Sequence, residues 1–220
     1  MTVSTSSSDA ARFFDGFAAQ FDTLYDDQRG PLMRWIDRRF RSDMFARFAL
    51  TFEEMSDVAG KSVLDIGCGS GPYVIETLRR GAGKVTALDP APGMLELTRA
   101  RIANTPYVDK CELVLGSFPG PQLEPHDFAM AMGVLDYVED AESFLRELRP
   151  LVNELAMISF PSTHWFRTPV RAVRYRLRNC PLYFYNEWKI ESLARRAGWT
   201  NISINKIQGA GLDFHVCLRP

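Results

Sequence analysis

One short stretch near residue 65 constrains the fold of this chain more than any other. Residues 62–66 are mostly apolar with Asp65 among them, a pattern typical of a buried strand. Glycines then occupy alternate positions from 67 to 71, and Pro72 precedes a segment of helical character over 73–80. Proline suits the first turn of a helix because the N–H that it lacks would have no partner there. The stretch therefore predicts a strand, a glycine turn and a helix, a unit whose turn lets a ligand approach bare backbone.

Two classes of ligand compete for such a turn. The dinucleotide fingerprint G-x-G-x-x-G requires its third glycine at position 72, where this chain has Pro72. An acidic residue inside the strand, such as Asp65, is also not part of that fingerprint. Both departures count against a nicotinamide or flavin fold, which is nevertheless the main rival interpretation. The purely structural interpretation is tight helix–strand packing without any ligand.

The segment 65–71 reads D-I-G-C-G-S-G and resembles the first motif of class I S-adenosylmethionine-dependent methyltransferases. In that family the glycine turn lies under the methionine and ribose parts of the cofactor, and the acidic residue engages its ammonium group, directly or through water. The resemblance implies S-adenosylmethionine as cofactor, S-adenosylhomocysteine as product, and cofactor contacts from Asp65, Gly67, Cys68, Gly69 and Gly71. It also implies an α/β fold: a Rossmann-like, seven-stranded, mostly parallel sheet with helices on both faces, an antiparallel C-terminal hairpin and a helical N-terminal extension.

Composition limits the remaining possibilities. The chain has 220 residues, 46% of them hydrophobic, which is enough for one domain with a substantial core. A formal net charge of −1 gives no whole-protein field toward nucleic acid or an anionic membrane. No apolar run approaches the roughly 20 residues of a membrane span, and the serine-rich N-terminus lacks the apolar centre of a signal peptide. The cysteines have no C-x-x-C spacing, which predicts free thiols in a reducing, cytoplasmic compartment for Cys68, Cys111, Cys180 and Cys217.

The first part of the chain, 1–58, is expected to form a helical lid ahead of a methyltransferase domain over 59–220. Phenylalanines at helical spacing between 13 and 21 predict a first helix, and a second helical region follows Pro31. The segment around Tyr25 looks like the one that precedes the core in many small-molecule methyltransferases, in which a tyrosine closes over the cofactor. Tyr25 is therefore a candidate cofactor contact, and packing of its ring at a domain boundary is the alternative.

A second strand, expected over 84–89, ends in Asp89, which follows the last glycine of the turn by 18 residues. A doubly wound nucleotide-binding fold places an acid here to accept hydrogen bonds from both ribose hydroxyls. The structural alternative is that Asp89 caps a helix that begins near Pro92. By the resemblance, Pro90 and Met94 border the adenine.

The third and fourth strands, expected over 111–116 and 127–132, lead to further cofactor contacts. The family often has an aspartate after the third strand for the adenine amino group, and this chain has Ser117 instead. A hydroxyl or a backbone N–H is then the expected adenine contact, with Phe118 beside the ring. Met132, at the end of the fourth strand, completes the set of expected cofactor-binding residues.

The acceptor substrate is expected beyond the carboxyl ends of the strands, where ligands of open α/β sheets bind. Many members of the family have an acid followed by a histidine after the fourth strand, and this chain has Asp136 followed by Tyr137. Tyr137 either polarises a substrate hydroxyl or lines the pocket. His164 follows the fifth strand, which is expected over 155–160, and is either a base or substrate contact or a surface histidine. Asp136, Tyr137 and His164 are the catalytic candidates.

Residues 162–185 are the most individual part of the chain. Arginines recur there every three or four residues, which places them on one stripe of a helix: Arg167, Arg171, Arg174 and Arg178. Beside aromatic residues, the arginine stripe could grip a phosphate, a carboxylate, an RNA backbone or a membrane surface. A solvated helix face is the alternative. The candidate acceptor-binding residues are Arg171, Arg174 and Tyr185.

Elimination favours a small-molecule acceptor. The chain lacks the [D/N/S]-P-P-[Y/F/W] motif of adenine-N6 and cytosine-N4 enzymes, a well-placed nucleophilic cysteine and a set of metal ligands. Its layout is loosely similar to that of ubiquinone-pathway and magnesium-porphyrin O-methyltransferases. We therefore expect methyl transfer to oxygen or nitrogen of a small molecule, anionic acceptors included, with neither metal nor nucleic acid and with the oligomeric state left open. The alternatives are an RNA methyltransferase that uses the arginine stripe and a non-catalytic cofactor-binding protein.

Overall fold

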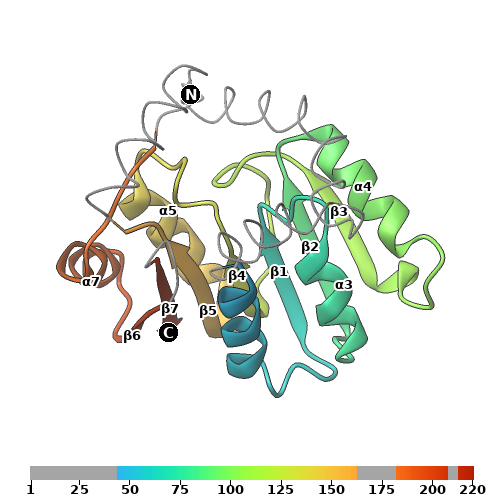
Figure 1. The fold of residues 1–220 in the computed structure, drawn as a ribbon, viewed down its shortest axis with the longest axis horizontal. Coiled ribbons are helices and arrows are strands. Elements are labelled where there is room, and N and C mark those ends of the chain that lie inside the picture. The colour runs from blue at the N-terminus through green and yellow to red at the C-terminus, as the bar shows by residue number, and fades with distance from the viewer. Residues whose placement is uncertain (1–43, 163–181, 208–212) are drawn as a thin grey trace, which may run out of the picture.

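A computed structural model describes residues 44–162, 182–207 and 213–220 of the chain. Seven strands form one sheet: β1 (Ser62–Ile66), β2 (Lys84–Asp89), β3 (Cys111–Leu115), β4 (His126–Ala131), β5 (Val152–Phe160), β6 (Asn201–Lys206) and β7 (Phe214–Arg219). Their order is β3-β2-β1-β4-β5-β7-β6 (Figure 1). The first five strands are parallel, and β7 is antiparallel to both of its neighbours, β5 and β6. The predicted fold class is confirmed, including the antiparallel C-terminal hairpin.

Helix ends follow the local sequence. The described helices are residues 44–54, α3 (Pro72–Arg79), α4 (Pro92–Ile102), α5 (Ala141–Leu148) and α7 (Glu187–Arg196), with short 3₁₀ helices η2 (Val108–Lys110) and η3 (Arg149–Leu151). A proline opens both α3 and α4, as expected for a residue without an N–H. Asp140 and Asn186 cap α5 and α7, since the side chain of each accepts a hydrogen bond from a backbone N–H in the first turn.

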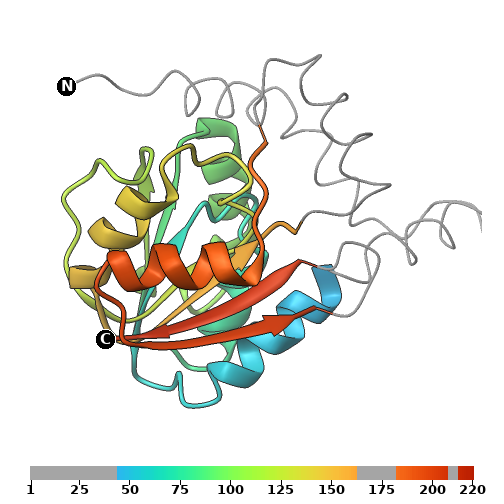
Figure 2. The ribbon, with the colours of Figure 1, turned by 90° about the vertical axis from the view of Figure 1, so that its left-hand side faces the viewer.

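The sheet separates two hydrophobic layers. Neighbouring residues along a strand point to opposite faces, so Leu64 packs with α5 and α7, whereas Val63 packs with residues 44–54, α3 and α4. Figure 2 shows α5 and α7 on one side of the strands and the helix of residues 44–54 on the other. Helices therefore cover both faces and leave the carboxyl ends of the parallel strands as the place for a ligand.

Two differences from the expected elements are small. The fifth strand was expected from Leu155 and begins at Val152, and the fourth begins at His126. Most of the expected N-terminal extension, residues 1–43, lies outside the described residues. Within the described ranges, no helix has the length and apolar character needed to cross a bilayer.

Candidate cofactor and acceptor site

The glycine turn between β1 and α3 is open toward solvent and packed from one side. Gly67 has a φ of 71° and Gly69 a φ of 57°, both in the left-handed region that favours glycine. A Cβ on Gly67 would lie 2.5 Å from Cγ2 of Val134, so the loop after β4 rests directly on bare backbone. A Cβ on Gly69 would meet no atom of the described part of the chain within 4 Å. The turn therefore offers accessible backbone at Gly69 and a tight contact at Gly67.

Asp65 is a buried carboxylate that lacks a partner on one oxygen. The side chain is 2% exposed, and its Oδ2 has no hydrogen-bond partner among the described residues. Burial and the nearby charge of Asp89 raise the pKa of Asp65 to about 8. A buried polar atom without a partner is costly unless a ligand supplies one. An ammonium group of a ligand meets this requirement through a charged hydrogen bond.

Asp89 stands at the end of β2 and accepts two backbone hydrogen bonds. Its Oδ2 lies 2.9 Å from the nitrogen of Gly69, and its Oδ1 lies 2.9 Å from the nitrogen of Ala91. Burial raises the pKa of Asp89, and these two N–H donors partly oppose the rise. The alternative expectation that Asp89 caps the next helix is wrong, because Ala91 occupies the N-cap of α4. Each carboxylate oxygen keeps a second lone pair with which to accept a ribose hydroxyl.

The expected adenine contacts are only partly accessible. Met94 is buried against Ala91, whereas Pro90 and Ser117 are half-buried. The Phe118 ring makes an edge contact with Phe144 of α5, with ring centroids 5.0 Å apart. Their roles as cofactor contacts stay predictions, and so does that of the buried Met132.

Two of the acceptor-side candidates lie together beyond the strand ends. Asp136 is buried, and its carbonyl accepts a hydrogen bond of 2.9 Å from the backbone nitrogen of Tyr183. Tyr185 is buried against Phe160, with ring centroids 5.1 Å apart. Burial and the charge of Asp136 raise the pKa of Tyr185, so the phenol remains protonated at neutral pH. Tyr137 is half-buried in the same loop as Asp136.

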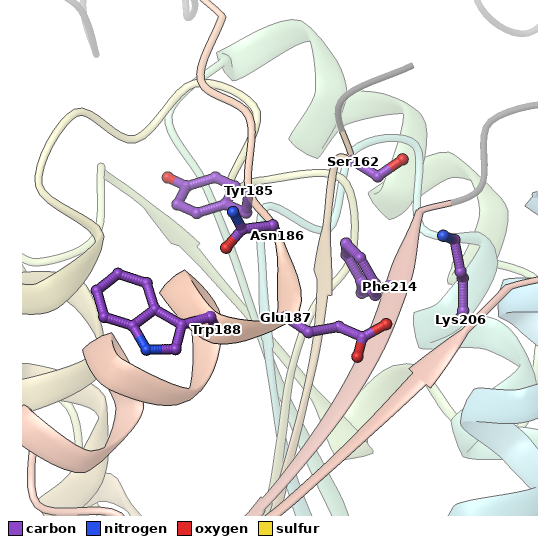
Figure 3. A pocket seen from close by; sticks show the side chains of 7 residues that line it. All are labelled: Ser162, Tyr185, Asn186, Glu187, Trp188, Lys206 and Phe214. Atoms are coloured by element: carbon purple, nitrogen blue, oxygen red, sulfur yellow. The ribbon is translucent and has the colours of Figure 1, made fainter. Parts of the chain in front are cut away.

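A hollow of about 340 Å³ opens at this end of the sheet (Figure 3). It is lined by Ser162, Tyr185, Asn186, Glu187, Trp188, Lys206 and Phe214. These residues come from the end of β5, the start of α7, the end of β6 and the start of β7. The volume is at the lower end of the range for small-molecule sites. The lining includes the predicted acceptor contact Tyr185.

Several expected site residues lie outside the described residues: Tyr25, His164, and the arginine stripe with Arg171 and Arg174. Cys180 lies there too, and the three described cysteines are free thiols. The described residues contain no group of three or more side chains able to hold a metal ion.

The structure adds Arg47, which the motif analysis missed. Its Nη1 lies 3.3 Å from Oγ of Ser159, it also hydrogen-bonds with Tyr73, and its buried Nε has no partner among the described residues. The pKa of Arg47 is raised overall. Burial lowers it, but the interactions with Tyr73, Asp136 and Asp213 together outweigh burial, so the guanidinium remains charged. A Cβ on Gly133 would lie 3.7 Å from Nη1, which places the guanidinium beside the loop that rests on the glycine turn.

A sequence signal for Arg47 did exist. Arg47, Thr51 and Met55 follow one another at intervals of four, which is one face of a helix. Thr51 and Met55 are fully buried. An arginine on the face of a helix that packs into the core is unusual, and this pattern marks it as a candidate for a site.

Comparison with known proteins agrees with this geometry. Residues 63–154, from β1 into β5, match a family described as a methyltransferase domain. The chain is 35% identical over 136 residues to a mitochondrial ubiquinone biosynthesis O-methyltransferase of Schizosaccharomyces pombe, covering 61% of this chain and 48% of the relative. It is 30% identical over 121 residues to a tRNA U34 carboxymethyltransferase of Idiomarina loihiensis, covering 54% of this chain and 37% of the relative. The chain thus spans about half or less of these two curated relatives.

A solved structure has a similar fold. Magnesium protoporphyrin IX methyltransferase from Synechocystis PCC 6803, with bound SAH (S-adenosylhomocysteine), superposes with a TM-score of 0.77 at 16% identity, covering 98% of this chain and 100% of that one. Residues 63–154 therefore form a methyltransferase domain, and the similarities in sequence and fold support a class I S-adenosylmethionine-dependent methyltransferase.

Proposed function

We propose that this chain transfers a methyl group from S-adenosylmethionine to oxygen or nitrogen of a small-molecule acceptor. The observation that carries the proposal is the unpartnered Oδ2 of buried Asp65 beside an open glycine turn. The ammonium group of the cofactor would supply the missing partner, and the oxygens of Asp89 would accept the ribose hydroxyls.

The amino-acid end of the cofactor carries a carboxylate as well as an ammonium group, and we assign the carboxylate to Arg47. A guanidinium has five N–H donors. Ser159 and Tyr73 hydrogen-bond with Arg47, and the charges of Asp136 and Asp213 act on it, while its buried Nε has no partner among the described residues. The remaining donors and the charge suit a carboxylate, and Arg47 adjoins the loop that rests on Gly67. Asp65 and Arg47 would then hold the two opposite charges of one zwitterion.

When bound, S-adenosylmethionine supplies a methyl group made electrophilic by its sulfonium, so alignment of the nucleophile is the protein's main task. On the acceptor side, Tyr185, whose hydroxyl donates to the carbonyl oxygen of Val138 at 3.5 Å, would contribute its ring to the wall of the acceptor site. The carboxylate of Asp136 would take the proton from an acceptor hydroxyl. An amine acceptor would need only to be held in its neutral form.

The size and lining of the hollow at the end of β5 support a small acceptor. The hollow is lined by aromatic rings and by the ammonium group of Lys206, and this lining suits a molecule with a planar apolar part. Two of the similar proteins are named for small molecules, ubiquinone and magnesium protoporphyrin IX. An RNA acceptor is the second candidate, because a tRNA-modifying enzyme is also similar.

The test is to incubate the full chain with S-adenosylmethionine labelled on the methyl group and with fractionated cell extract. Label in a low-mass compound is the expected result. Label that appears only in RNA, with binding that weakens steeply with salt, would support the second candidate. Cofactor binding without any labelled product in any fraction would indicate a non-catalytic binding protein.

A further inference from the structure

A cluster of buried polar side chains lies where the helix of residues 44–54 meets the sheet. Thr51 and His215 are 0% exposed, and Ser159 is 2% exposed. Ser159 and His215 are paired across β5 and β7, while Thr51 comes from the helix. Burial of three polar side chains is costly unless all are hydrogen-bonded. All three of these side chains have hydrogen-bond partners.

The hydroxyl of Ser159 joins two groups of the proposed site. Its Oγ accepts a hydrogen bond of 2.7 Å from the backbone nitrogen of Gly133 and one of 3.3 Å from Nη1 of Arg47. Gly133 immediately precedes Val134, the residue that rests on Gly67. One oxygen therefore links the guanidinium to the loop that covers the glycine turn.

Thr51 and His215 hold the backbone of the same arginine. The Thr51 hydroxyl donates to the carbonyl oxygen of Arg47 at 2.8 Å and lies 3.2 Å from Nε2 of His215. Since its one proton goes to the carbonyl, Thr51 accepts from His215, which requires the tautomer with hydrogen on Nε2. Burial and the charge of Arg47 lower the pKa of His215 to about 4, so the ring stays neutral near pH 7. The backbone of Arg47 is thus fixed independently of its guanidinium.

We propose that Ser159 is a positioning residue for binding of the methyl donor. Its single oxygen orients the guanidinium of Arg47 toward the donor carboxylate and holds Gly133, so that the loop stays seated on the glycine turn. The inference depends on the role proposed for Arg47 above. Removal of the Ser159 hydroxyl leaves two donors without an acceptor and lets the guanidinium leave its productive orientation.

The test compares two ligands on the full chain by calorimetry: SAH and 5′-(3-aminopropylthio)-5′-deoxyadenosine, which is SAH without its carboxylate. The wild type is expected to bind SAH at least tenfold more tightly. Arg47→Met should bring the ratio of affinities close to one, and Ser159→Ala should lower it at least threefold. Ser159→Ala in the Arg47→Met background should lower the ratio no further, because both changes act on one interaction. Ser159→Thr retains the hydroxyl and should restore the wild-type ratio.

Thr77→Val in α3 is the matched control, since it removes a buried hydroxyl that has no hydrogen-bond partner among the described residues. It should leave the ratio unchanged. If Ser159→Ala weakens both ligands equally or weakens neither, Ser159 has no positioning role and the inference is overturned. A wild type that binds both ligands equally overturns the inference and the role of Arg47, but leaves a donor site in place. A wild type that binds neither contradicts the proposed function itself. If Ser159→Ala does not fold, Ser159→Cys has nearly the same shape with a weaker acceptor, and the same ratio decides.

Discussion

At the scale of single residues, Asp65 links cofactor binding to a cost in stability. Its pKa of about 8 in the folded protein lies far above the ordinary value of 3.8. The folded state therefore holds a proton that the unfolded state has lost between these two values. The contribution of Asp65 to stability is present below about pH 4 and is lost as pH rises to about 8.

The first prediction concerns stability without ligand. Asp65→Asn removes the titrating group, so the variant should be more stable than the wild type at pH 8 by up to roughly 5 kcal/mol, since each unit of pKa shift corresponds to about 1.4 kcal/mol. The free energies of unfolding should converge as pH falls toward 4. Urea denaturation of both proteins at several pH values measures this difference, and parallel pH dependences would contradict the assignment.

The second prediction concerns the ligand. An ammonium group needs the ionised form of Asp65, so the affinity for SAH should rise by up to roughly tenfold per unit from pH 6 to 8. The Asp65→Asn variant should bind weakly and with little dependence on pH. Calorimetric titrations at three pH values decide between this and an affinity that is flat in the wild type.

The third prediction concerns the ribose. Asp89→Ala removes the expected acceptor for the ribose hydroxyls, and it also frees the N–H groups of Gly69 and Ala91. The affinity for SAH should fall at least roughly tenfold, in line with one or two charged hydrogen bonds. Asp109→Ala changes an exposed aspartate outside the site and serves as the control. Equal affinities of Asp89→Ala and the wild type would show that the ribose assignment is wrong.

The sequence predicted the residues that belong to a contiguous motif and missed those assembled by packing. Asp65 is the residue before the last of β1 and Asp89 is the last of β2, so their position near the carboxyl edge follows from the pattern of apolar residues. Arg47 and Ser159 are 112 residues apart and meet only because the helix of residues 44–54 docks on the sheet. No local pattern marks Ser159, whose partners all come from other elements.

At the scale of elements, the fourth prediction separates two glycines of one turn. Both have positive φ, so alanine is strained at either position. Only at Gly67 would the new Cβ collide with Val134, at 2.5 Å. Gly67→Ala should therefore lower the free energy of unfolding by roughly 1–3 kcal/mol more than Gly69→Ala. Denaturation of the two variants measures this difference.

Val134→Ala provides the control for that comparison. In the Gly67→Ala background it removes the colliding methyl group and should recover part of the lost stability. In the Gly69→Ala background it should recover none. Gly69→Ala should instead act on ligand binding, since its methyl group would occupy the open side of the turn. If the two glycine variants lose the same stability, the contact with Val134 is not what requires Gly67.

The ends of helices and strands were predictable where a single residue acts on the backbone next to it. Pro72 starts α3 as expected and Asn186 caps α7, because a missing N–H and a side-chain acceptor each act within one turn. The start of β5 was placed three residues late, because Asn153 and Glu154 interrupt the apolar run at an irregularity in the pairing, before which Val152 still pairs with His126. Ladder hydrogen bonds extend a strand past the point where its side chains become polar.

At the scale of the whole molecule, the order of the strands puts the site together. β1 and β4 are adjacent at the centre, so the glycine turn after β1 and the loop after β4 meet at one edge. Seven strands and a final antiparallel hairpin were expected through the resemblance to the family. The position of β7 between β5 and β6 depends on pairings between distant segments, and it was not predicted.

The most direct measurement is calorimetric titration of the full chain with SAH and, separately, with NADH. We expect SAH to bind with one site per chain, and Asp65→Asn to reduce that affinity strongly. NADH should give no binding, because the turn has Pro72 where a dinucleotide site needs glycine. Binding of NADH without binding of SAH would contradict the assignment of a methyl-donor site to the glycine turn.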